Sequence, residues 1–176
     1  MKKIIVLALT AIFACGAAYA QHGHGNCGNC PHHAQHQNKQ AQAPKQLTDA
    51  EVLASAFPTM KSVKAKGKWN MVYDSNSKLL GYVVYSRPES NGIRGYAGET
   101  PVMIAFDTKK VITGVYLLAN QETPRFTQHV EQSGFYKQWN GLTVKKAKKQ
   151  EVDVVSGATF TSRAVVQSVK AVLEKL

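Results

Sequence analysis

The sequence predicts an α+β domain in which a mostly antiparallel sheet is flanked by helices. Two observations lead to this fold class: extended apolar segments are grouped in the middle of the chain, and amphipathic helical patterns follow them. The chain has 176 residues, of which 44% are hydrophobic, and this fits one globular domain with a single core.

The first twenty residues are predicted to be a secretory signal peptide. Lys2 and Lys3 precede a short apolar run, and the small-residue pattern "AYA" ends at Ala20. Cleavage there predicts a secreted or periplasmic protein that meets membranes only transiently. Two alternatives are a retained anchor and a lipid attached at Cys15, which would hold the protein on the outer face of a membrane.

Residues 21–46 are predicted to form a disordered tether, because they contain no aliphatic side chain larger than alanine before Leu47. Cys27 and Cys30 form a CxxC pair, and His32 and His33 follow it. Thiolates and imidazoles are ligands that zinc and copper prefer. An inert tether, a disulfide between the two cysteines and thiol chemistry are the other interpretations that remain open.

The formal net charge of +11 allows several kinds of acidic partner. Lysines gather in residues 61–68 and 145–149, where exposed faces or loops explain them, with an acidic redox partner as the alternative. Nucleic acid is not expected, because the protein is predicted to be secreted and its basic residues do not alternate with aromatic ones.

The folded domain is expected to span residues 47–176. Thr48 and Glu51 have the spacing of a capping box at the start of a short helix, which Pro58 ends. Two antiparallel hairpins are then predicted, formed by residues 69–74 with 79–86 and by residues 101–107 with 111–119.

Two further helices are predicted after the hairpins. The first begins with Thr123 as a capping residue and Pro124 at its first position, and it spaces Phe126, Val130 and Phe135 along one face. The last helix covers residues 162–176. Its apolar stripe consists of Val165, Val169, Val172 and Leu173.

The stretch "DVVSGATFTS" (residues 153–162) joins a strand-like segment, 152–155, to the last helix. Free amides at a helix start favour an anion such as phosphate, and the small residues Gly157 and Ala158 would let it approach the backbone. Plain helix capping by Ser and Thr is the alternative interpretation.

The same stretch resembles the flavinylation motif of the FMN-binding domain family, which occurs in flavin-carrying subunits of Rnf-type and sodium-translocating NADH:quinone oxidoreductase complexes. The matching positions are Asp153, Ser156, Gly157, Ala158, Thr159 and Thr161. A Gly-Tyr-x-Gly turn, a Glu-Thr-Pro segment and residues 135–142 also resemble the family. The first two correspond to Gly95, Tyr96 and Gly98, and to Glu122, Thr123 and Pro124. Arg125 stands where the family usually has glycine.

The resemblance implies covalent FMN. In the family a dedicated FMN transferase esterifies the last threonine of the motif with the flavin phosphate, which makes Thr161 the acceptor. It also implies that Gly95 and Gly98 permit close approach of the flavin ring and that Tyr96 lies against it. Glu122 and Thr123 would then bond the flavin edges, or merely cap the following helix.

We therefore expect a secreted electron-transfer flavoprotein that exchanges electrons with a donor and an acceptor protein, both unidentified. The sequence contains neither a nicotinamide fingerprint nor a catalytic triad, so we name no catalytic residue and favour a carrier over a stand-alone reductase. The alternatives are a secreted protein that binds zinc or copper through its tether, and an extracytoplasmic flavin-dependent reductase.

Overall fold

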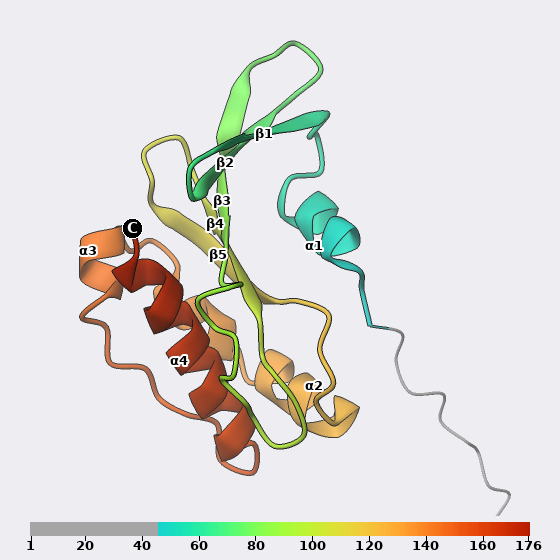
Figure 1. The fold of residues 1–176 in the computed structure, drawn as a ribbon, viewed down its shortest axis with the longest axis vertical. Coiled ribbons are helices and arrows are strands. Elements are labelled where there is room, and N and C mark those ends of the chain that lie inside the picture. The colour runs from blue at the N-terminus through green and yellow to red at the C-terminus, as the bar shows by residue number, and fades with distance from the viewer. Residues whose placement is uncertain (1–45) are drawn as a thin grey trace, which may run out of the picture. The chain divides into compact units, whose positions relative to one another are not determined.

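A computed structural model describes residues 46–176 (Figure 1). Five strands form one sheet in the order β1-β2-β3-β4-β5, and every neighbouring pair is antiparallel. The fold class is therefore confirmed as α+β with an antiparallel sheet. The strands are β1 (Ser62–Lys66), β2 (Trp69–Tyr73), β3 (Leu79–Tyr85), β4 (Val102–Phe106) and β5 (Ile112–Leu117).

Helices cover both faces of this sheet. The helical elements are α1 (Asp49–Ala56), α2 (Pro124–Gln132), the 3-10 helix η1 (Phe135–Trp139), α3 (Val144–Ala147) and α4 (Thr159–Glu174). Side chains of α1 pack into one buried cluster and those of α2, η1, α3 and α4 into another. Figure 1 shows α1 and α4 on opposite sides of the sheet accordingly.

Strand β4 is buried along its whole length because it contributes to both clusters. Met103 and Ala105 belong to the α1 cluster, whereas Ile104 and Phe106 belong to the α4 cluster. Side chains of a strand alternate between faces, so one strand supports both layers. The apolar stripe predicted for the last helix lies entirely in the α4 cluster.

The predicted capping box and both predicted hairpins are confirmed. The N–H of Thr48 donates to Glu51 Oε2 at 2.7 Å and the N–H of Glu51 donates to Thr48 Oγ1 at 3.3 Å, which is the capping box. The predicted hairpins correspond to β2 with β3 and β4 with β5.

Three elements were not predicted: the 3-10 helix η1, which contains Phe135 beyond the end of α2 at Gln132, and the two elements β1 and α3. Strand β1 lies in a lysine-rich segment, and all its residues are exposed at the edge of the sheet. The segment was expected to be exposed, but it has no buried face and so lacks the apolar alternation that identifies a strand. The short helix α3 lies in the second lysine-rich segment, where Ala147 is the buried residue.

Three local predictions are wrong. Thr123 occupies the predicted N-cap position of α2, but its side chain makes no capping hydrogen bond. The N–H of Phe126, which a capping side chain could accept, donates to the carbonyl of Thr123 at 2.9 Å instead. Residues 152–155 form no strand. The last helix begins at Thr159 rather than 162, because the N–H of Ser162 already donates to the carbonyl of Ala158 at 2.9 Å.

The predicted signal peptide and nearly all of the tether lie outside the described residues. The expected roles of Cys15, Cys27, Cys30, His32 and His33 therefore stay predictions. Within residues 46–176, no helix has the length and apolar character needed to cross a bilayer.

Candidate functional site

A buried carboxylate, Glu122, organises the site between β5 and α2. Its side chain is 3% exposed. The N–H of Tyr96 donates to Oε2 at 3.1 Å, and the N–H groups of Ala97 and Gly98 both donate to Oε1 at 2.7 Å. Three consecutive amides of the connection between β3 and β4 thus hold one carboxylate, and we call residues 95–98 the covering segment.

Thr161 meets the same carboxylate from the start of α4. Its hydroxyl Oγ1 donates to Glu122 Oε2 at 2.5 Å, although the two residues are 39 positions apart, and Thr161 is 0% exposed. In Figure 1 the connection between β3 and β4 runs down beside α4 and approaches α2. The predicted flavin acceptor is therefore buried and bonded to the same carboxylate that the covering segment holds.

The glycines of the covering segment allow this contact. A Cβ atom on Gly95 would lie 2.8 Å from Cδ of Glu122, and one on Gly98 would lie 2.9 Å from Cβ of Gln121. No side chain fits at such distances without a shift of the neighbours. Both glycines thus allow the close approach of the backbone to residues 121 and 122, and their predicted approach to a flavin ring stays a prediction.

The hydrogen bonds decide the ionisation of Glu122. Burial by itself raises the pKa of this carboxyl, but the bonds from Thr161, Gly98, Ala97 and Tyr96 together outweigh it and leave the pKa below its usual 4.5. The carboxylate is therefore charged at neutral pH, and hydrogen bonds from three backbone amides and one hydroxyl stabilise its charge.

This pKa predicts how stability depends on pH. A carboxyl whose pKa is lowered by folding stabilises the folded state above its unfolded pKa, and this stabilisation disappears as the pH falls through the folded value. The melting temperature of the wild type should therefore exceed that of Glu122→Gln at pH 7, and the difference should shrink below about pH 4.5. Thermal melts of both proteins from pH 7 to pH 3 measure it. A difference that stays constant across this range would contradict the assignment.

The turn before α4 is held by hydroxyls and by a glycine. Gly157 has a φ of +79°, a conformation that favours glycine. Ser162 Oγ accepts the N–H of Val155 at 3.0 Å and donates to the carbonyl of Ala158 at 2.9 Å. Thr159 Oγ1 donates to the Val155 carbonyl at 3.4 Å. Two of the four hydroxyls of the stretch therefore shape the turn, although the N-cap position of α4 is Ala158 and no side-chain cap bond is made there.

The remaining motif positions are more open. Ser156 and Gly157 are exposed, whereas Ala158 is buried. Nε2 of His129 on α2 donates to the carbonyl of Ser156 at 2.9 Å, so this histidine ties α2 to the motif. Only the position of His129 beside the turn reveals this contact.

Asp153 is exposed, and its backbone is anchored by η1. Gln138 Nε2 donates to the carbonyl of Asp153 at 3.1 Å, and the N–H of Asp153 donates to Gln138 Oε1 at 3.0 Å. The side chain of Gln138 thus supplies the N–H and the carbonyl of Asp153 with the hydrogen bonds that a neighbouring strand would otherwise supply. This explains why residues 152–155 join no sheet. Gln138 is a second residue of the site that no sequence pattern indicated.

Aromatic side chains and a cavity lie beside the motif. Tyr96 is 63% exposed and makes an edge-to-face contact with Phe126 at 4.9 Å between ring centroids. Phe160, next to Thr161, is 67% exposed. A cavity of about 320 Å³ lies against Phe126. It is lined by Arg125, Phe126, Gln128, His129, Gln132 and Gly157.

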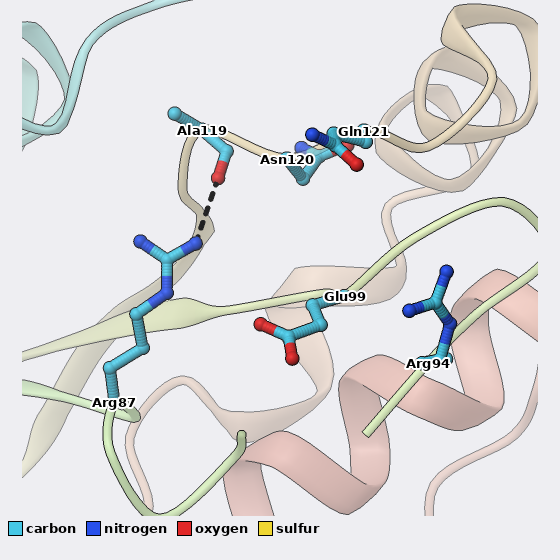
Figure 2. A pocket seen from close by; sticks show the side chains of 6 residues that line it. All are labelled: Arg87, Arg94, Glu99, Ala119, Asn120 and Gln121. Atoms are coloured by element: carbon cyan, nitrogen blue, oxygen red, sulfur yellow. Dashed lines mark hydrogen bonds between the residues drawn. The ribbon is translucent and has the colours of Figure 1, made fainter. Parts of the chain in front are cut away.

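A second cavity, of about 410 Å³, borders the covering segment (Figure 2). Arg87 donates to the carbonyl of Ala119 at 3.3 Å, and Arg94 donates to the carbonyl of Ala97 at 3.2 Å. Figure 2 shows Glu99 between the two guanidinium groups. This wall carries more positive than negative charge, so it favours anionic groups.

Residues 46–176 contain no group of three or more His, Cys, Asp or Glu side chains that could hold a metal ion. The predicted ligands Cys27, Cys30, His32 and His33 lie outside this range. The predicted zinc or copper site therefore stays a prediction about the tether.

The fold and the site define an α+β cofactor-binding domain, in which a small-residue turn at a helix start meets a glycine-containing segment and exposed aromatic rings. Residues 95–174 match the family model described as FMN-binding domain, so the chain is similar to that family over this range. The matched range begins at the covering segment and ends at the last turn of α4, so it contains the whole acceptor site.

Curated relatives agree with this family. The chain is 34% identical over 95 residues to a component of the Na(+)-translocating ferredoxin:NAD(+) oxidoreductase complex of Acetobacterium woodii, covering 54% of this chain and 42% of the relative. It is 34% identical over 144 residues to a component of the ion-translocating oxidoreductase complex of Aliivibrio fischeri, covering 72% of this chain and 65% of the relative. The chain thus spans less than two thirds of either protein.

Among solved structures, the chain is similar to the crystal structure of Shewanella oneidensis NqrC. The TM-score is 0.42 and the identity 22%, over 70% of each chain.

Proposed function

We propose that this protein is an extracytoplasmic electron-transfer flavoprotein that carries FMN esterified to Thr161. The observation that carries the proposal is the bond between Thr161 Oγ1 and Glu122 Oε2 at 2.5 Å, because it sets the last threonine of the motif apart from the others. When bound, FMN supplies the redox chemistry through its ring, and the protein supplies position and electrostatics.

The residues around Thr161 fit FMN. The cavity of about 320 Å³ adjoins Gly157 and presents Arg125 and His129, which suit a flavin phosphate, together with the ring of Phe126. Tyr96 and Phe160 offer exposed aromatic surface close by. A purely structural role for the motif accounts for the hydroxyls of Thr159 and Ser162 but leaves these exposed rings unexplained.

Esterification requires that the buried Thr161 become accessible. Thr161 is 0% exposed, so an FMN transferase reaches its hydroxyl only after part of the domain moves, and residues 95–98 are the segment that shares its carboxylate partner. We therefore propose that the transferase acts on an open form of the domain. The relatives named above belong to oxidoreductase complexes, which supports protein partners as electron donor and acceptor.

The intact mass of the protein tests the proposal. The full chain is co-expressed with an FMN transferase in a secretory host, and the product is denatured before mass analysis. We expect a gain equal to FMN less one water, located on the peptide that contains Thr161, and an N-terminus at Gln21. A sample prepared without the transferase is the control. An unmodified mass in the presence of active transferase would contradict covalent FMN.

A further inference from the structure

We propose that Glu122 activates the acceptor hydroxyl: its carboxylate orients Thr161 Oγ1 toward the incoming flavin phosphate and takes up the hydroxyl proton as the ester forms. This inference rests on the proposed function, because it concerns the reaction that would attach FMN. It assigns to Glu122 a role in modification, which differs from bonding a flavin edge or capping α2.

The geometry distinguishes Thr161 from the other hydroxyls of the motif. Thr159 and Ser162 donate to backbone carbonyls, which are not proton acceptors at neutral pH. Thr161 donates to a carboxylate at 2.5 Å, within the range of short hydrogen bonds to an ionised acceptor. Because the single hydroxyl proton is directed at Glu122, the lone pairs of Oγ1 are directed away from it, where a phosphorus atom would be attacked.

The covering segment regulates the basicity of Glu122. In the closed arrangement its three amides stabilise the carboxylate and make it a weak base. When the segment lifts, Glu122 loses these donors while it can keep its bond to Thr161. The carboxylate therefore gains basicity in the same movement that exposes the hydroxyl.

The segment is built to move as one unit. The N–H of Gly95 donates to the carbonyl of Gly98 at 2.8 Å, and the backbones of Arg94 and Glu99 pair as an isolated antiparallel β-bridge at its base. The hydrogen bonds that its backbone N–H groups donate to Glu122 are therefore lost together, without the turn itself unfolding. Tyr96 is mostly exposed, so lifting the segment costs little buried apolar area at that residue.

The chemical step needs an activated flavin phosphate, because FMN alone would have to expel water. A phosphoanhydride of FMN, such as a flavin dinucleotide, supplies it. The bond between Thr161 Oγ1 and the flavin phosphorus forms, and the anhydride P–O bond breaks. The nucleotide phosphate leaves with the bonding electrons, and the proton of Oγ1 passes to Glu122 Oε2. The ester oxygen then carries no hydrogen and no longer donates to Glu122.

Transfer kinetics with purified FMN transferase and a flavin dinucleotide test the inference. The full chain is the varied substrate, and covalent flavin is measured after denaturation. We expect Glu122→Gln to lower kcat about 100-fold, which is within the range for loss of a general base, while KM changes less than about threefold. Glu122→Asp, which keeps the charge on a shorter side chain, should give a kcat between those of the other two proteins.

Each outcome decides a different question. A kcat of Glu122→Gln equal to that of the wild type, or a rise in KM alone, would overturn the inference and leave Glu122 as a support for the covering segment. No ester on the wild type would overturn the proposed function as well. Thermal melts show whether Glu122→Gln is folded. If it is not, Glu122→Asp decides, and an unchanged kcat in that variant overturns the inference.

Discussion

Replacing Thr161 with alanine is expected to remove covalent flavin completely. The substitution deletes the one oxygen that could carry the ester, and no rearrangement of the other side chains replaces it. The three amides of the covering segment still hold Glu122, so the fold should persist. The measurement is flavin fluorescence of the denatured protein on a gel, together with its intact mass, after co-expression with an FMN transferase.

Thr159→Ala is the matched control. Thr159 is the same residue type two positions earlier in α4, and its hydroxyl makes a single bond of 3.4 Å to the carbonyl of Val155. This variant keeps the acceptor oxygen of Thr161, so it should still carry covalent flavin, in a smaller amount to the extent that the loosened turn slows the transfer. Flavin retained by Thr161→Ala, or lost only from Thr159→Ala, would show that the acceptor has been assigned to the wrong residue.

Trp139→Ala is expected to cost about 3–5 kcal/mol of folding stability, because a buried aromatic side chain is removed and leaves a cavity. Trp139 is 1% exposed and packs edge-to-face on Phe135 at 5.4 Å. It ends η1, the element whose Gln138 anchors Asp153, so the variant should also loosen the segment before the acceptor turn. Urea unfolding followed by circular dichroism measures the loss.

Phe160→Ala provides the comparison for this second prediction. Phe160 is also aromatic, but it is 67% exposed, so its removal should change the free energy of unfolding by less than about 0.5 kcal/mol. Equal destabilisation by the two substitutions would contradict the packing described for η1.

Elements whose patterns are local were predictable. The capping box of Thr48 and Glu51 needs residues only three positions apart, and the hairpins need only apolar alternation on both sides of a turn. Strand β1 escaped prediction because an exposed edge strand has no buried face to mark its period. The segment at residues 152–155 was misjudged because its backbone pairs with the side chains of Gln138 and Ser162, and no local pattern encodes such partners.

The motif at residues 153–161, and with it the family and the predicted acceptor Thr161, could be read from the sequence alone, because the turn and the helix start are encoded by adjacent residues. The residue that hydrogen-bonds this acceptor could not be read from the sequence. Glu122 follows β5, the covering segment lies between β3 and β4, and Thr161 begins α4. Only the packing of α4 against the sheet brings these three separate segments to one carboxylate, because a contact across 39 positions depends on how whole elements pack rather than on any local preference.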